Sequence, residues 1–305
     1  MNINPINEAE YYRDCTLCPR NCHANRSEGK TGYCRAGAGI TAARAALHYW
    51  EEPCISGTRG SGTVFFSGCS LGCVYCQNYD ISRNQAGKVI SIDRLADIFL
   101  EMQEQKALNI NLVTPSHYVP SIVKAIEKGK AKGLCIPVVY NSSGYESVEI
   151  LKLLEGSVDI YLPDFKYFDQ ELSYRYSGCR DYFEIASQSL KEMVRQTGEA
   201  VLEENIMKKG VIVRHLLLPG GLSDSKKVIK YLYNTYRDTI YISIMNQYTP
   251  LEQVKEYPEI NRRVTKKEYE ALVDYALDLG VENGFIQEGE TASESFIPAF
   301  DYQGI

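Results

Sequence analysis

Three cysteines with close spacing are the residues of this chain best suited to chemistry. Cys69, Cys73 and Cys76 form a C-x3-C-x2-C pattern in a glycine-containing segment. Thiolates at this spacing bind soft metal centres, which in proteins means zinc or an iron–sulfur cluster. Three ligands leave one metal position open, the feature that separates catalytic from structural metal sites. The pattern therefore predicts a reactive metal centre.

A second group of cysteines lies near the N-terminus. It comprises four of the ten cysteines in the chain, Cys15, Cys18, Cys22 and Cys34. Their spacing matches neither a plain zinc ribbon nor the run of bacterial ferredoxins. Four ligands on a segment too short for its own core predict a closed, structural metal site. Zinc and a second iron–sulfur cluster both remain open, as do an unmetallated extension and a redox-active Cys15/Cys18 pair.

Charge and targeting patterns limit where the protein works. The 33 Lys and Arg against 39 Asp and Glu give a net charge of −6, which argues against nucleic-acid binding through a general basic field. The first residues lack the basic and apolar regions of a signal peptide, and no apolar run approaches the roughly 18 residues of a membrane helix. We therefore expect a cytoplasmic protein without a membrane partner, in which clustered thiols serve as metal ligands or catalytic groups.

From residue 63 onward, apolar strand patterns alternate with helical ones. The helical patterns begin at Ser91 and lie around 122–126, 148–154 and 181–196, after Ser223, and from a capping box at Thr265 to Gly280. Six strand–helix units in a row imply a parallel sheet, either doubly wound or a barrel. The predicted strands are 63–66, 110–113, 136–140, 158–162, 211–218 and 239–244.

The chain is expected to have three parts. Residues 1–58 lack the alternation and are predicted to form a small Cys-rich, metal-binding extension, joined by a glycine-rich stretch. Residues 59–250 form the α/β domain, and 251–305 provide a C-terminal helix and tail packed on it.

Polar residues follow each predicted strand. Because ligands bind beyond the carboxyl ends of parallel strands, we expect these residues to surround one site. On the fifth strand, Arg214 and His215 must face opposite sides, and we assign Arg214 to the site because its guanidinium suits a carboxylate. The other strand-end candidates are Thr114, Ser116, His117, Asn141, Ser143, Asp164, Lys166 and Gln247.

The segment 65–78, Phe-Phe-Ser-Gly-Cys-x3-Cys-x2-Cys-Gln-Asn, directly after the first strand, resembles the radical S-adenosylmethionine (radical SAM) enzymes. It is most similar to their pyruvate formate-lyase-activating-enzyme-like branch, and the order of elements agrees over roughly residues 55–250. The resemblance implies an α/β fold, a partial (β/α)6 barrel, here with the Cys-rich extension.

The resemblance also implies a reaction. A 4Fe–4S cluster would be held by Cys69, Cys73 and Cys76, and its fourth iron would bind the amino and carboxylate groups of S-adenosylmethionine. A one-electron donor such as flavodoxin or ferredoxin would reduce the cluster. The sulfonium C–S bond would then break, and a 5′-deoxyadenosyl radical would abstract hydrogen from the substrate.

Site residues follow from the same resemblance. Tyr75 would lie near the adenine, with Asn78 on the same loop. Asn141 and Ser143 resemble a Thr-Asn-Gly element that contacts the ribose or methionine, and Asp164 with Lys166 resembles an Asp-x-Lys element. Many relatives carry Gly-Gly-Glu after the second strand to receive the methionine ammonium. This chain has Thr114-Pro-Ser116-His117 there, so hydroxyls, carbonyls or His117 would take that role. We expect Lys166, Asp164 and Arg214 to be catalytic.

The substrate remains open. One hypothesis is an activase that takes hydrogen from a glycine of a glycyl-radical enzyme. Another is a radical enzyme acting directly on a small molecule, a peptide or RNA. A third is a non-enzymatic iron–sulfur electron carrier or zinc scaffold. The sequence does not identify the electron donor or the oligomeric state.

Overall fold

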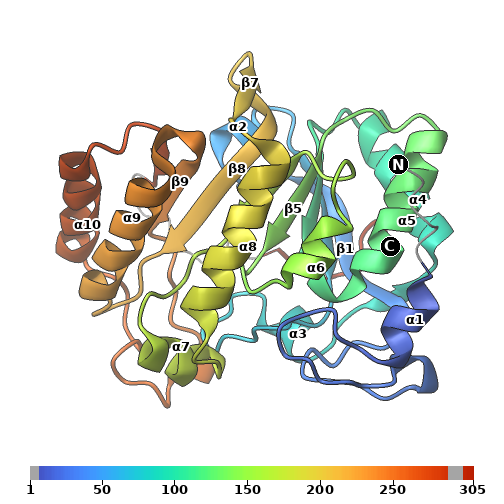
Figure 1. Cartoon of the computed structure of the whole chain (residues 1–305), viewed down its shortest axis with the longest axis horizontal. Helices are drawn as coiled ribbons and strands as arrows, with labels where there is room; N and C mark the ends of the chain where they lie inside the picture. The colour runs from blue at the N-terminus through green and yellow to red at the C-terminus, as the bar shows by residue number, and fades with distance from the viewer. Residues whose placement is uncertain (1–6, 288–297) are drawn as a thin grey trace.

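A mixed β-sheet forms the centre of the computed structural model, which describes residues 7–287 and 298–305 (Figure 1). Its strand order is β10-β9-β8-β6-β5-β4-β2-β1-β3. The six predicted strands are all present and parallel, and a seventh parallel strand, β10, follows them. These strands are β2 (Ser61–Phe66), β4 (Ile110–Val113), β5 (Val138–Ser142), β6 (Ile160–Pro163), β8 (Ile206–Leu216), β9 (Tyr241–Met245) and β10 (Gly284–Ile286).

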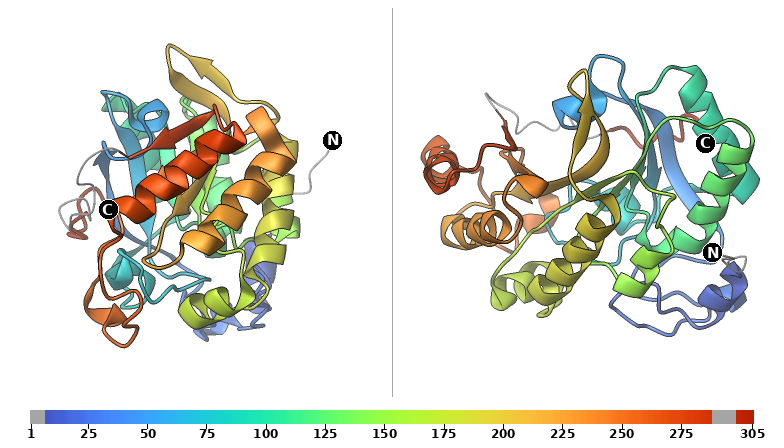
Figure 2. Two further views of the ribbon diagram at one scale, coloured as in Figure 1. Left: turned by 90° about the vertical axis from the view of Figure 1, so that its left-hand side faces the viewer. Right: turned by 45° about the horizontal axis from the view of Figure 1, so that its top comes forward.

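Crossover helices cover the outside of this sheet. Helix α4 packs on α5, α6 on α8, and α9 on α10, so that the helices lie in an arc around the strands (Figure 2). Within the described residues, the edge strands β10 and β3 do not pair, so the barrel is partial, as predicted. The helices are α4 (Ile92–Glu104), α5 (Val119–Ala131), α6 (Val148–Lys152), α8 (Tyr182–Thr197), α9 (Leu222–Tyr236) and α10 (Lys266–Leu279).

Local sequence signals set the ends of these helices. The Ser91 hydroxyl caps α4 by accepting the Arg94 N–H, and the apolar face of the helix is buried against the sheet. The predicted capping box of Thr265 and Glu268 begins α10, which ends at Gly280 in the left-handed conformation.

Strand β1 (Ile40–His48) was not predicted. It pairs antiparallel with β2 and with β3 (Lys88–Ile90), although its alanine-rich sequence has weak strand propensity. It lies inside the segment 1–58 expected to be an extension, so this segment contributes one strand to the sheet, and the part before Ile40 lies outside it. That part contains α1 (Glu8–Arg13) and the 3-10 turn η1 (Arg26–Glu28), and its Tyr12 hydroxyl meets Ser121 of α5 at 2.7 Å.

Several short elements complete the chain. Strand β8 starts earlier than predicted because it forms a hairpin with β7 (Val201–Glu203). The C-terminal tail runs along β1, where Ala45 N–H donates to Gln303 O at 2.8 Å and Tyr302 N–H to Ala43 O at 3.1 Å. Other short elements are α2 (Pro53–Ser56), α3 (Tyr79–Ser82), α7 (Gln170–Ser177) and the turns η2 (Ser116–Tyr118), η3 (Arg237–Thr239) and η4 (Glu252–Val254).

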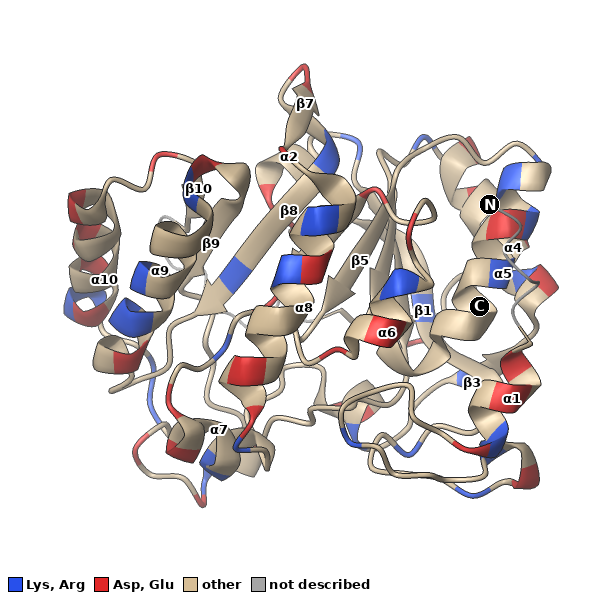
Figure 3. Ribbon diagram, viewed as in Figure 1, with Lys and Arg blue, Asp and Glu red and all other residues tan. Residues whose placement is uncertain are grey.

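The molecular surface carries both signs of charge. Lysines and arginines are interspersed with acidic residues on the outward faces of the helices in the view of Figure 3. Where the structure describes the chain, it contains no helix long and apolar enough to span a membrane.

Candidate active site

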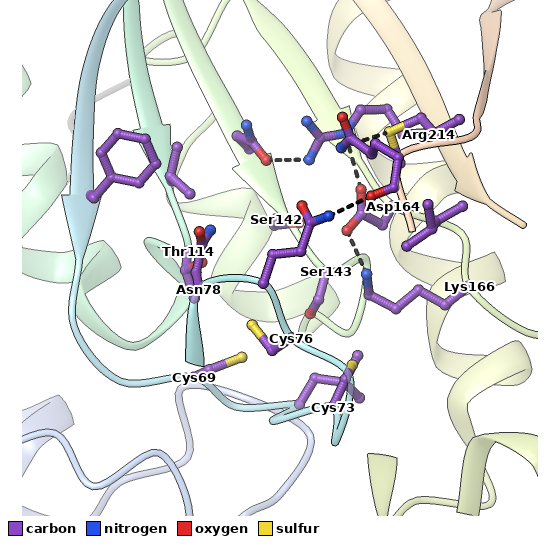
Figure 4. A pocket seen from close by; sticks show the side chains of 18 of the residues that line it. Cys69, Cys73, Cys76, Asn78, Thr114, Ser142, Ser143, Asp164, Lys166 and Arg214 are labelled. Carbon is purple, nitrogen blue, oxygen red and sulfur yellow. Dashed lines mark hydrogen bonds and ion pairs between the residues drawn. The ribbon is translucent and has the colours of Figure 1, made fainter. Parts of the chain in front are cut away.

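A pocket opens at the carboxyl ends of the parallel strands, where the register brings neighbouring strand ends level. Phe65 pairs with Val113, Val113 with Asn141, and Arg214 bridges Asp164. Figure 4 shows the three cysteines on one side of this pocket and the charged strand-end residues on the other. The predicted residues that line it are Cys69, Cys73, Tyr75, Cys76, Asn78, Thr114, Asn141, Ser143, Asp164, Lys166, Arg214 and Gln247.

The three loop cysteines lie close enough to influence one another electrostatically. Burial, and then the neighbouring charge of Cys73, raises the pKa of Cys69; burial and then Cys69 raise the pKa of Cys76 to about 12. The backbone N–H of Gly72 lies 3.3 Å from Cys69 Sγ and points toward it. Thiols this close to one another lose their protons together only beside a bound cationic centre, so these residues fit the cluster that the sequence implies.

A charged network occupies the opposite wall. Arg214 Nε donates to Asp164 Oδ1 at 3.0 Å, its Nη1 to Glu51 Oε2 at 3.0 Å, and its Nη2 to Asn141 Oδ1 at 2.6 Å. Lys166 Nζ donates to the other oxygen of Asp164 at 2.6 Å. The guanidinium therefore holds two carboxylates from different strand ends in fixed positions.

The network fixes its own charge state. Burial alone would raise the pKa of Asp164, but the cations of Lys166 and Arg214 hold it below its usual value. Burial opposes the charge of Lys166, yet Asp164 raises its pKa. Burial raises the pKa of Glu52, and the charge of Arg214 opposes this rise. The pocket wall thus presents Asp164 as an anion and Lys166 and Arg214 as cations at neutral pH.

Thr114 has an unusual backbone at this pocket. Its φ is 58°, in the left-handed region that a β-branched residue rarely adopts, and its N–H donates to Asn141 O at 2.9 Å. Strain of this kind is retained where the surroundings fix the backbone, and it is concentrated at functional sites.

Two predicted ligand-contacting residues lie outside the pocket lining. Ser116 is buried and donates to Glu146 Oε1 at 2.6 Å. His117 is also buried, with Nε2 lying 2.8 Å from Ser67 O, and burial lowers its pKa to about 3. Both side chains are buried because the turn η2 directs this segment into the interior, and their contact with a ligand stays a prediction.

Arg214 and His215 face opposite sides of β8, as strand alternation predicts. Arg214 lines the pocket, whereas His215 is buried behind the sheet with Nδ1 lying 2.7 Å from Phe165 O. No described residue pairs with His215 Nε2. Burial lowers the pKa of His215 to about 4.

The buried His215 makes stability depend on pH. In the unfolded chain the histidine binds a proton below about pH 6.5, whereas folded His215 stays neutral down to about pH 4. The free energy of unfolding therefore decreases as the pH falls from about 6.5 to about 4. We expect His215→Asn, which keeps a donor toward Phe165 O, to flatten the slope of unfolding free energy between these pH values by up to about 1.4 kcal/mol per pH unit. Urea unfolding at several pH values measures this, and an unchanged slope would contradict it.

The contribution of β1 to the pocket was not predicted from the sequence. His48, the last residue of this strand, lines the pocket together with Trp50 and Glu51 beyond it. Burial lowers the pKa of His48 to about 4. The available signal was the polar run His-Tyr-Trp-Glu-Glu at 48–52, but it was not used because the preceding alanine-rich strand was not recognised.

The four N-terminal cysteines come together beside the cysteine loop. Burial, then Cys34 and Cys15, raise the pKa of Cys18 to about 12, while burial together with Cys15 and Cys22 raises that of Cys34. Cys15, Cys18 and Cys34 are buried and Cys22 is exposed. In the described ranges, no three His, Cys, Asp or Glu side chains converge tightly enough for one metal ion, so binding a single ion would require the thiols to move closer.

Comparisons with known proteins give consistent results. The sequence pattern of the family described as Radical SAM superfamily matches residues 63–232. An uncharacterized protein of Methanocaldococcus jannaschii is 33% identical over 281 residues, covering 88% of this chain and 77% of that protein.

Solved structures share the fold at low identity. SuiB of Streptococcus suis bound to S-adenosylmethionine superposes with a TM-score of 0.51 at 12% identity, over 74% of this chain and 52% of that one. The FeFe-hydrogenase maturase HydG of Carboxydothermus hydrogenoformans gives 0.50 at 12% identity, over 77% and 56%. This chain therefore spans about half the length of these structures.

Proposed function

The chain belongs to the radical SAM superfamily, and we propose that it is an enzyme that cleaves S-adenosylmethionine reductively and abstracts hydrogen from a substrate. The observation that carries this proposal is the pocket itself. Three cysteine thiols line one side, and a fixed arrangement of one anion and two cations lines the other. An electron carrier or a zinc scaffold does not require the charged residues Asp164, Lys166 and Arg214 opposite the cysteines.

Cys69, Cys73 and Cys76 would hold the 4Fe–4S cluster, which supplies the electron that breaks the sulfonium C–S bond. Lys166 is suited to the methionine carboxylate, and Asp164 to the ammonium group. Arg214 would hold Asp164 and Glu51 in position through its ion pairs with both carboxylates. Further contacts to the ligand would come from Tyr75, Asn78, Thr114, Asn141, Ser143 and Gln247, which line the same pocket.

We propose a second metal group on Cys15, Cys18, Cys22 and Cys34. The support is that burial and mutual charge raise the pKa of Cys18 and of Cys34. Zinc and a second iron–sulfur cluster both remain candidates. Iron, sulfide and zinc counts on anaerobically purified protein decide between them: about four irons with zinc favour the first, about eight irons the second.

If the protein is an activase, its substrate is a glycine of a partner protein. If it acts directly, its substrate is a small molecule, a peptide or RNA. The resemblance to the activating-enzyme-like branch favours a glycyl-radical-enzyme partner. A glycyl radical signal that appears in such a partner only with the active protein would establish an activase, and its absence would favour direct catalysis. A flavodoxin or ferredoxin would supply the electron. All ten cysteines are free, which supports a reducing, cytoplasmic setting.

Ligand binding at the open cluster position tests the proposal. We expect the electron paramagnetic resonance signal of the reduced cluster to change when S-adenosylmethionine is added, because the ligand would enter the open iron position. A signal that saturating ligand leaves unchanged would argue against this site.

A further inference from the structure

The hydroxyl of Ser177 lies against the sulfur of one proposed cluster ligand. Ser177 Oγ donates to Cys73 Sγ over 3.1 Å, and both residues are buried. The hydroxyl of Tyr167 lies 2.8 Å from the same Oγ. Tyr167 donates its one proton to Tyr75 Oη at 2.7 Å, and Ser177 directs its own proton to the sulfur of Cys73.

The position of Ser177 is fixed from the N-terminal segment. Ser177 is the last residue of α7, where the helix carbonyls lack intrahelical partners. Arg20 Nη2 donates to Ser177 O at 2.8 Å, and Nη1 donates to Gly178 O at 2.7 Å. The guanidinium therefore caps the end of this helix.

The same guanidinium also binds the cysteine loop. Arg20 Nε donates to Ser70 O at 2.9 Å, and Nη2 donates to Leu71 O at 3.3 Å. A backbone bond from Val74 N–H to Tyr176 O at 2.9 Å adds a second link between loop and helix. Arg20 lies between Cys18 and Cys22, so the N-terminal cysteine segment places Ser177 against Cys73.

Hydrogen bonds to cluster thiolates set the reduction potential of a cluster. A reduced cluster carries one more negative charge than the oxidised one, so a donor to its sulfur stabilises the reduced form more. We infer that Ser177 raises the reduction potential of the cluster through Cys73, and that Arg20 is the residue that positions Ser177. The inference rests on the proposed cluster at Cys69, Cys73 and Cys76.

A redox measurement on the complete, cluster-loaded protein tests this. At a fixed potential in a dithionite-poised solution, we expect Ser177→Ala to lower the ratio of reduced to oxidised cluster by about three- to tenfold, the range expected for one hydrogen bond. Ser173→Ala is the matched control, because Ser173 is a buried serine of the same helix that donates to Cys179 O instead. Its ratio should equal that of the unmodified protein, and Ser177→Thr should restore most of the loss.

Arg20→Lys distinguishes the positioning of Ser177 from the effect of a nearby positive charge. It keeps the charge but loses the planar guanidinium that binds several carbonyls at once. It should lower the ratio in the unmodified background and have almost no effect in the Ser177→Ala background, since both changes act on one hydrogen bond. Equal ratios for Ser177→Ala and the unmodified protein at full iron content would overturn the inference. If Ser177→Ala does not assemble a cluster, an unchanged ratio in Arg20→Lys would overturn it. Lack of any cluster in the unmodified protein would instead refute the proposed function.

Discussion

Cys73→Ala is expected to abolish formation of 5′-deoxyadenosine from S-adenosylmethionine. Cys73 is a buried member of the three-cysteine loop, so its loss removes one of three proposed iron ligands. The loss should exceed the roughly 100-fold caused by removing an outer partner of a metal ligand. Anaerobic assays with a chemical reductant, together with iron and sulfide counts, measure both effects.

Cys135→Ala is the matched control for this experiment. Cys135 is exposed and lies outside both cysteine groups. It should retain iron content and activity. Full 5′-deoxyadenosine production by Cys73→Ala would show that the loop does not hold the reactive cluster.

Arg214→Met is expected to destabilise the fold as well as the site. Arg214 is mostly buried and pairs with both Asp164 and Glu51, at 3.0 Å in each case. Removing one partner of a buried ion pair leaves uncompensated charge, which costs about 3–5 kcal/mol. Lys166 still neutralises Asp164, so the larger penalty falls on Glu51, which keeps only amide donors. Urea unfolding measures the loss.

Two further variants make this prediction specific. Arg195→Met removes an exposed arginine of α8 that pairs with Glu155 and Glu192, and it should change stability much less. Adding Glu51→Gln to Arg214→Met should recover part of the lost stability, because the unpaired charge is gone. Similar losses for Arg214→Met and Arg195→Met would contradict the idea that Arg214 holds the buried wall of the pocket.

The parallel core was predictable because its signals are local. The strand at 110–113 was predicted with the bounds of β4, and the capping box at Thr265 marks the start of α10. Strand β1 was missed because its stability comes from pairing with β2 and with the C-terminal tail, contacts distant in sequence, and not from its alanines.

The site was predictable where residues directly follow a strand in the common register. Asp164 and Lys166 follow β6 directly, and Arg214 of the neighbouring β8 lies level with Asp164. Glu51 was missed with its strand, and the burial of His117 in a short turn could not be predicted from its position after a strand. The contact between Ser177 and Cys73 joins segments 104 positions apart and depends on the geometry of Arg20, which no spacing rule describes.

One measurement tests the central proposal most directly. The cluster-loaded protein is incubated without oxygen with S-adenosylmethionine and dithionite, and the products are quantified by mass spectrometry. One electron and one abstracted hydrogen atom convert each S-adenosylmethionine into methionine and 5′-deoxyadenosine. We predict equal amounts of both products, formed only when reductant is present. No 5′-deoxyadenosine from protein with an intact cluster and bound S-adenosylmethionine would contradict the proposal.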